Sequence, residues 1–351
     1  MTTFHHALRR HFVFRSLAAW LAAGSMATGA MSAALAQEGS GAAAASRTPT
    51  GKVPAAVSVL SIVEHPSLDA LRDGLHDELK DAGYQNGKSL HWAYQSAQGN
   101  QGTAVQIARK FVGDRPDVIV PIATPAAQAV VSATHQIPVV YNAITDPIAA
   151  QIVKSMAPSG TNVTGVSDKL VADRQVAFIK RVVPDVKRVG IIYSPAEANS
   201  VSATREMKVA LEKQGISLVE VAAPRSIDVG QAAQRLVGKV DVIYTSNDNN
   251  VISAYESVIK VANAAKIPLI CADRSSVQRG ATGAMAIDYY RMGRQTGRMV
   301  LRILNGEKPG DIASETSDRL DITLNLDAAR RQGATLSPEL QAEASEIFGK
   351  P

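Results

Sequence analysis

The stretch VSVLSIVEHPSLDALRDGLHDELKDAGY, residues 57–84, has a counterpart of the same plan in VGIIYSPAEANSVSATREMKVALEKQGI, residues 189–216. Each begins with a short apolar run, continues through a polar loop that contains an acidic residue, and ends in a segment with helical periodicity. The units that follow also correspond, at residues 116–146 and 240–273. Alternating strands and helices of this kind predict parallel sheets covered by helices on both faces. The repeat therefore predicts two similar, doubly wound α/β lobes.

The pattern of apolar runs places the elements of each lobe. For the first lobe we expect strands at 56–63, 89–95, 117–123 and 138–144, and helices at 67–82, 101–113 and 125–134. For the second we expect strands near 187–193, 216–222, 240–245, 267–272 and 281–287, and helices near 169–183, 199–214, 229–238 and 249–264. Ser67 is a candidate N-cap of the first helix and Gly83 a candidate terminator. An amphipathic helix at 289–304 could close the first lobe, and a last strand at 320–326 would return to the second.

The chain is expected to cross between the lobes three times, near 160–166, 285–289 and 310–320. The first crossing is placed by the run PSGTNVTGVS, residues 158–167, which is rich in turn-forming residues. The first lobe would then comprise 55–162 and 288–312, and the second 163–287 and 313–351. Three such segments form a hinge that bends without unfolding either core.

Residues 1–36 have the features of an export signal. Arg9, Arg10 and Arg15 precede a small-residue apolar stretch, and Ala-Leu-Ala at 34–36 fits a cleavage site before Gln37. The stretch is poor in leucine, which favours a cleaved signal over a retained membrane anchor. The paired arginines also resemble a twin-arginine signal, so two export routes stay open. Residues 37–54 are expected to form a flexible linker, and the mature protein to be free in the periplasm.

Removal of this segment changes the charge of the protein. The segment contains three arginines and no acid, so the formal net charge falls from +5 to +2. No dense basic run interleaved with aromatic residues is left, which argues against nucleic acid as a partner. Cys271 is the only cysteine, so no intramolecular disulfide can form. It lies inside a predicted apolar strand, where an inert core role is the simpler interpretation.

Motifs for catalysis or metal binding are scarce. The mature histidines form no HExxH and no i, i+4 pair, and neither a nucleophile elbow nor a phosphate-binding glycine loop is present. We therefore expect no catalytic residue, no metal site and no cofactor. The competing hypothesis is an exported amino-acid racemase or hydrolase, which would need a nucleophile or an acid–base pair.

Polar residues gather after the predicted strands, where open α/β sheets bind ligands. The candidate ligand-binding residues are Glu64, His65, Thr124, Thr145, Asp146, Asn199, Ser200, Asp248, Asn249 and Asp273. Thr124 and Thr145 begin helical segments whose free N–H groups favour a carboxylate, although helix capping explains them equally well. Asp146, Asp248 and Asp273 would suit a ligand ammonium group if they converge on one crevice, and each could also be a cap.

Six segments carry a family likeness. They are PIATPAAQA (121–129), IPVVYNAITDP (137–147), TNVTGVSD (161–168), SNDNNV (246–251), DYYRMGRQTG (288–297) and ITLNLDAAR (322–330). In this order they strongly resemble ABC transporter substrate-binding proteins, in the branch that includes tryptophan- and aromatic-amino-acid-binding members. The resemblance covers residues 55–345. It implies a type I periplasmic-binding-protein fold that closes on a small ligand and delivers it to an inner-membrane permease.

The ligand we expect is an α-amino acid with an aromatic or branched side chain, because helix-terminus donors and facing acids suit a zwitterion. We expect a monomer. Gram-positive members of the family carry a lipid anchor on a cysteine that this sequence lacks, which fits a periplasmic protein. A sensor module that presents its loaded form to a membrane receptor would have the same fold and is a further alternative.

Overall fold

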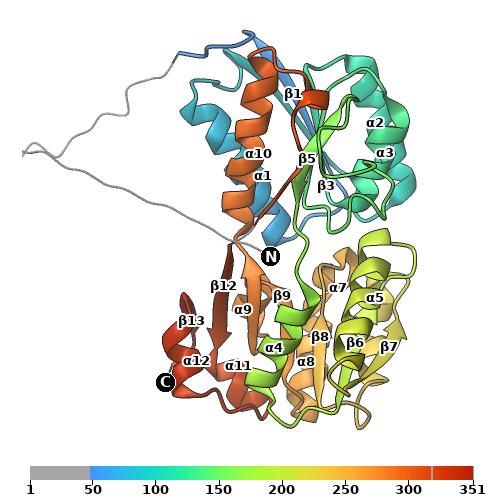
Figure 1. Ribbon diagram of the computed structural model, residues 1–351, viewed down its shortest axis with the longest axis vertical. Coiled ribbons are helices and arrows are strands. Elements are labelled where there is room, and N and C mark those ends of the chain that lie inside the picture. The colour runs from blue at the N-terminus through green and yellow to red at the C-terminus, as the bar shows by residue number, and fades with distance from the viewer. Residues whose placement is uncertain (1–47, 318, 351) are drawn as a thin grey trace, which may run out of the picture. The chain divides into compact units, whose positions relative to one another are not determined.

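The computed structural model describes residues 48–317 and 319–350 (Figure 1). The predicted export signal at 1–36, the cleavage site before Gln37 and most of the predicted linker at 37–54 lie outside the described residues. The described chain forms two parallel-sheet lobes, as the repeat in the sequence predicts. Among these residues, no helix combines the length and the apolar character needed to cross a membrane.

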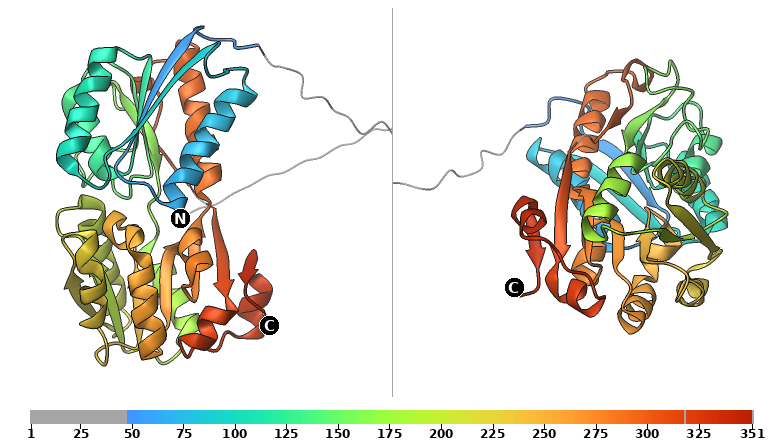
Figure 2. Two further views of the ribbon diagram at one scale, coloured as in Figure 1. Left: turned by 180° about the vertical axis from the view of Figure 1, so that it is seen from behind. Right: turned by 60° about the horizontal axis from the view of Figure 1, so that its bottom comes forward.

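The first lobe is built on a six-stranded sheet in the order β11-β5-β4-β3-β1-β2, with all pairs parallel. Its strands are β1 (Ala55–Ser61), β2 (Leu90–Ser96), β3 (Val118–Ile122), β4 (Val139–Asn142), β5 (Val163–Ser167) and β11 (Glu315–Thr316). Its helices are α1 (Pro66–Asp81), α2 (Gln101–Asp114), α3 (Thr124–Ala133), α10 (Tyr289–Leu304) and the 3₁₀ turn η2 (Pro309–Asp311). Helices α1 and α10 cover one face of the sheet and α2 and α3 the other (Figures 1 and 2).

The second lobe contains a seven-stranded sheet in the order β13-β12-β10-β9-β8-β6-β7, in which only β10 and β12 pair antiparallel. Its strands are β6 (Arg188–Tyr193), β7 (Ser217–Ala222), β8 (Val242–Thr245), β9 (Leu269–Asp273), β10 (Gly283–Ile287), β12 (Leu320–Asn325) and β13 (Glu346–Phe348). Its helices are α4 (Ala172–Val182), α5 (Ala198–Glu212), η1 (Ser226–Asp228), α6 (Val229–Gln234), α7 (Asn249–Ser253), α8 (Tyr255–Ala265), α9 (Arg274–Arg279), α11 (Leu326–Arg331) and α12 (Pro338–Glu343). Helices α4 and α5 bury one face of this sheet, and α6 and α8 bury the other.

Helix α10 joins the first lobe by unusually close packing against α1. A Cβ atom on Gly74 would lie 2.1 Å from the Tyr290 carbonyl oxygen, and one on Gly293 would lie 2.0 Å from that of Leu71. The two helices therefore approach backbone to backbone, which only glycine permits at these positions. Helix α1 begins one residue earlier than predicted, because Pro66 suits the first helical position and His65, not Ser67, is the N-cap.

The first crossing between the lobes lies later than the sequence predicts. Residues 163–167 form β5 of the first sheet, so the chain leaves that lobe only after Ser167. Gly165 allows β5 to pack closely against its neighbour, since a Cβ atom at this position would lie 2.2 Å from the Tyr141 carbonyl oxygen. The later crossings join β10 to α10 and β11 to β12, and β11 extends the first sheet beyond its expected end at 312.

Candidate functional site

Two small cavities lie at the carboxyl ends of the strands, where side chains from both lobes meet. The polar cavity is lined by His65, Leu68, Ala123, Ala143, Thr145, Asp168, Asn199, Asn247, Asn249, Ile252 and Tyr289. The apolar cavity is lined by Thr145, Leu170, Ala172, Gln175, Ala203, Glu206, Met207, Tyr244, Ser246, Asn247 and Ala272. Their volumes are about 10 and 30 Å³, and they share Thr145 and Asn247. Since a single water needs roughly 10–15 Å³, an amino acid could enter only if the lobes separate.

Asp168, which the sequence analysis did not single out, is the buried acid of the polar cavity. Its carboxylate accepts hydrogen bonds from Thr145 Oγ1 at 3.0 Å, from Asn247 Nδ2 at 2.9 Å and from Tyr289 Oη at 2.7 Å. Burial raises the pKa of this carboxyl, and hydrogen bonds from these three side chains and from its own backbone N–H oppose that rise.

A second buried acid, Glu197, orients two asparagines that line the polar cavity. Its Oε2 accepts from Asn199 Nδ2 at 3.1 Å and from Asn249 Nδ2 at 2.6 Å. A carboxylate only accepts, so it is the amide nitrogens that face it. The Oδ1 atoms of Asn199 and Asn247 are both buried, and neither has a hydrogen-bond partner among the described residues. Burial, followed by the nearby Asp248, raises the pKa of Glu197 to about 7.

The first lobe presents donors and a strained backbone to the same region. Ala123 and Ala143 follow the adjacent strands β3 and β4, line the polar cavity and have φ values of 71° and 54°. Such conformations are costly for residues other than glycine and tend to occur at ligand sites. Thr124 opens α3, and its buried Oγ1 finds no partner within the part of the chain that is described. The free amides of this helix terminus favour an anion.

Asp248 and Ser200, both predicted ligand contacts, bond to each other instead. Ser200 Oγ donates to Asp248 Oδ2 at 2.5 Å, and Ser194 N donates to the same oxygen at 2.6 Å. Oδ1 accepts from Ser194 Oγ at 2.8 Å and from Val251 N at 2.9 Å. All four acceptor positions of Asp248 are therefore occupied, and its role in this structure is to cap α7.

Asp273 links the lobes beside the polar cavity without lining it. Its Oδ1 accepts from Ser67 Oγ of the first lobe at 2.8 Å and from Ser276 N at 2.9 Å, which makes Asp273 the N-cap of α9.

His65, another predicted ligand contact, does line the polar cavity. Burial lowers the pKa of this imidazole to about 4, although Asp273 opposes the shift, so His65 is neutral at pH 7.

The two remaining predicted acids lie at the edges of the site. Asp146 accepts from Ala149 N at 2.9 Å, from Ser202 Oγ at 3.1 Å and from Lys169 Nζ at 3.3 Å. Burial alone would favour the neutral acid, but these donors lower the pKa of Asp146. Glu64 is exposed and accepts from Gln98 Nε2 at 2.9 Å. Of the ten predicted residues, the structure places His65, Thr145, Asn199 and Asn249 in the polar cavity.

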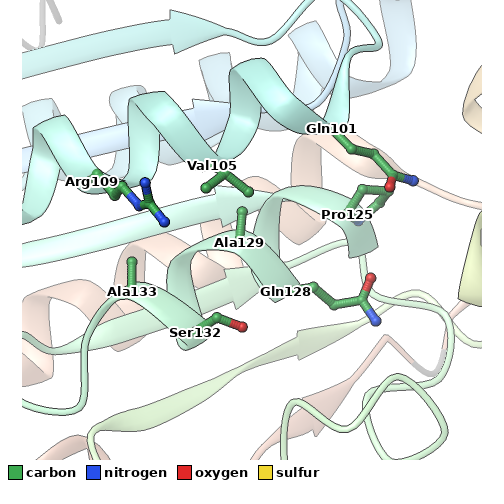
Figure 3. A pocket seen from close by; sticks show the side chains of 8 residues that line it. All are labelled: Gln101, Val105, Arg109, Pro125, Gln128, Ala129, Ser132 and Ala133. Carbon is green, nitrogen blue, oxygen red and sulfur yellow. The ribbon is translucent and has the colours of Figure 1, made fainter.

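Three further features of the described residues were compared with this site. A groove of about 270 Å³ between α2 and α3 is lined by short side chains together with Arg109, Gln101 and Gln128, and contains none of the predicted residues (Figure 3). The Cys271 thiol is fully buried, and burial raises its pKa well above the usual range, which makes it a poor nucleophile. Within residues 48–317 and 319–350, no group of acids, histidines and cysteines is arranged to hold a metal ion.

Comparison with known proteins identifies the family of this chain and covers nearly all of its described residues. A family model described as ABC transporter substrate binding protein matches residues 56–348. A tyrosine-binding protein of Clostridioides difficile is 37% identical over 293 residues, which are 84% of this chain and 85% of that protein. A conserved domain protein from Vibrio cholerae is 47% identical, with a TM-score of 0.83 over 84% of this chain and 99% of its own. An ABC domain from Streptococcus pneumoniae in complex with L-Trp is 33% identical, with a TM-score of 0.81 and the same coverage.

Proposed function

The chain belongs to the ABC transporter substrate-binding proteins, and we propose that it binds an aromatic amino acid, tyrosine or tryptophan, between its lobes. The members of this family are binding proteins of transporters and not enzymes, which removes the racemase and hydrolase alternatives. The tyrosine-binding relative and the relative with bound L-Trp support an aromatic ligand. The proposal rests on one observation above all: the polar cavity is lined by Asn199 and Asn247, whose buried oxygens have no partner among the described residues, and by Ala123, which precedes the N-terminus of α3.

The ammonium group of the ligand is assigned to Asp168 and not to Asp248 or Asp273. Asp168 is the acid that lines the polar cavity, whereas Asp248 and Asp273 both lie outside the lining and Asp248 already accepts four hydrogen bonds. The buried, unpaired oxygens of Asn199 and Asn247 supply two further acceptors. An ammonium group has three N–H donors, which matches these three acceptors.

The carboxylate of the ligand is assigned to the first lobe. The N-terminus of α3 offers free backbone amides and the unpaired Thr124 hydroxyl, next to the strained Ala123 in the cavity wall. A helix N-terminus favours negative charge, and a hydroxyl adds a directed donor. Because the two charges of a zwitterion would then be held by different groups, a simple amine or a simple acid satisfies only half of the site.

Transport requires that the lobes open and close. The hinge would consist of residues 168–171, the junction of β10 with α10, and the connection from β11 to β12. Cleavage before Gln37 would release a monomer into the periplasm, where it would deliver its ligand to an inner-membrane permease. Intact-mass measurement of periplasmic protein checks the cleavage: a species that retains residues 1–36 would contradict it.

A thermal-shift panel tests the proposed ligand class. Purified protein is compared with tyrosine, tryptophan, tyramine, 3-(4-hydroxyphenyl)propionate and glucose. At a hundred times its dissociation constant, a ligand adds about 2.7 kcal/mol of apparent stability. We expect tyrosine or tryptophan to stabilise the protein, and the two single-charge analogues to have little effect at the same concentration. Stabilisation by glucose alone, or equal stabilisation by the analogues, would contradict the zwitterion site.

A further inference from the structure

Gln175 is a buried side chain whose orientation the structure fixes. It lies on α4 and is 1% exposed. Its Nε2 donates to the Met285 carbonyl oxygen of β10 at 2.9 Å. Only the nitrogen of a side-chain amide can donate to a carbonyl, so Oε1 must point away from β10. Gln175 is also part of the lining of the apolar cavity.

The oxygen of this amide is an unused acceptor. Oε1 of Gln175 is buried and makes no hydrogen bond to any residue in the described ranges. A buried acceptor without a donor is costly, and such groups in native proteins call for an explanation. Rotating the amide would not relieve the cost, because the Met285 carbonyl oxygen would then face Oε1 and lose its donor.

The surroundings of Gln175 are suited to an aromatic ring. Its neighbours in the lining are mainly apolar: Leu170, Ala172, Ala203, Met207, Tyr244 and Ala272. Among the polar members, Ser246 contributes a second buried oxygen without a partner among the described residues. Thr145 and Asn247 also line the polar cavity, so a ligand whose ammonium and carboxylate groups are held there would direct its side chain into the apolar cavity. Glu206, at the edge, is already paired with Lys169 at 2.6 Å.

We propose that Gln175 determines specificity by accepting a hydrogen bond from an N–H or O–H on the ligand's aromatic ring. The inference rests on the proposed function and narrows it: the site takes tyrosine or tryptophan and discriminates against phenylalanine. A site built to bond a ligand hydroxyl or N–H rejects the analogue that lacks the donor, because its own polar group is then left unpaired. The donor-bearing ligand should bind at least about tenfold more tightly, which is ~1.4 kcal/mol.

Isothermal titration calorimetry with two matched ligand pairs tests the proposal. The pairs are tyrosine with phenylalanine, and tryptophan with 3-benzothienylalanine, in which sulfur replaces the indole N–H. In the wild-type protein we expect at least one pair to differ by about tenfold or more in favour of the donor. Gln175→Leu should reduce that ratio to less than about threefold, by weakening the donor-bearing ligand alone. A purely structural role of Gln175 would instead weaken both members of a pair equally.

Gln341→Leu is the matched control. Gln341 lies on α12, donates through Nε2 to the Leu336 carbonyl oxygen at 2.8 Å and belongs to neither cavity, so its variant should keep the wild-type ratio.

Equal affinities within each wild-type pair would overturn the inference without any variant. An unchanged affinity ratio in Gln175→Leu would also overturn it. If no aromatic amino acid binds the wild-type protein, the proposed function fails and the inference fails with it. Binding without discrimination overturns the inference alone.

Discussion

The effect of Glu197→Gln on the free energy of unfolding should be more favourable at pH 8 than at pH 5, because the substitution removes a buried carboxyl group that ionises near neutrality. Glu197 is 5% exposed. Its pKa is raised from 4.5 to about 7, first by burial and then by the charge of Asp248, while hydrogen bonds from Asn249 and Asn199 oppose the rise. Glutamine has nearly the same shape and carries no charge at any pH.

The sign and size of the effect follow from proton binding. Between pH 4.5 and 7 the folded protein holds a proton that the unfolded chain has released. The stability that Glu197 contributes is therefore complete below about pH 4.5 and lost as the pH rises through about 7. The shift amounts to ~3 kcal/mol, of which roughly 2–3 kcal/mol falls between pH 5 and pH 8. His65, whose pKa is lowered to about 4, titrates in both proteins and cancels in the comparison.

Urea unfolding with linear extrapolation, at pH 5 and pH 8, measures the effect. The stability of Glu197→Gln relative to wild type should be roughly 2–3 kcal/mol more favourable at pH 8 than at pH 5. Glu212→Gln, an exposed site on α5, is the control and should show no such pH dependence. A relative stability of Glu197→Gln that is the same at both pH values would refute the reasoning, whatever its sign.

Two further results are expected. Gly165→Ala should destabilise the protein by about 1–3 kcal/mol or more, because its Cβ would lie 2.2 Å from the Tyr141 carbonyl oxygen. Gly113→Ala on α2, where a Cβ meets nothing within 4 Å, should be neutral or stabilising in the same thermal-unfolding assay, and the opposite order would contradict the packing argument. Small-angle scattering should give a smaller radius of gyration with saturating tyrosine or tryptophan than without ligand. An unchanged profile at saturation would argue against hinge closure.

The repeated pattern in the sequence was sufficient to predict the architecture. Apolar runs that are buried on both faces of a sheet, such as β1 and β3, are visible in the sequence without any knowledge of their partners. The run 158–167 was assigned to a turn because it contains Pro, Ser, Gly and Asn. Its last five residues are a strand, and Gly165 is required there by contact with Tyr141, a neighbour from β4 that only the folded structure reveals.

The site was predicted less completely, because the availability of a carboxylate depends on distant donors. Asp248 and Asp168 both follow strands, and the sequence does not show that Ser194 and Ser200 saturate Asp248. Asp168 was overlooked because the preceding segment was assigned to a turn; as the residue after β5, it fitted the same rule that selected the other candidates. The proposed roles of Glu197 and Gln175 depend on how side-chain amide groups are oriented, for which the sequence holds no signal.

The most direct test of the central claim is the affinity of Asp168→Asn for tyrosine and tryptophan, measured by isothermal titration calorimetry with folding checked by circular dichroism. Removing the buried partner of a ligand charge costs on the order of 2–5 kcal/mol, so binding should weaken by at least about thirtyfold. Asp185→Asn, an exposed acid of the second lobe, is the control and should bind as wild type does. If folded Asp168→Asn binds the ligand of the wild-type protein with unchanged affinity, Asp168 does not receive an ammonium group and the account of the site is wrong.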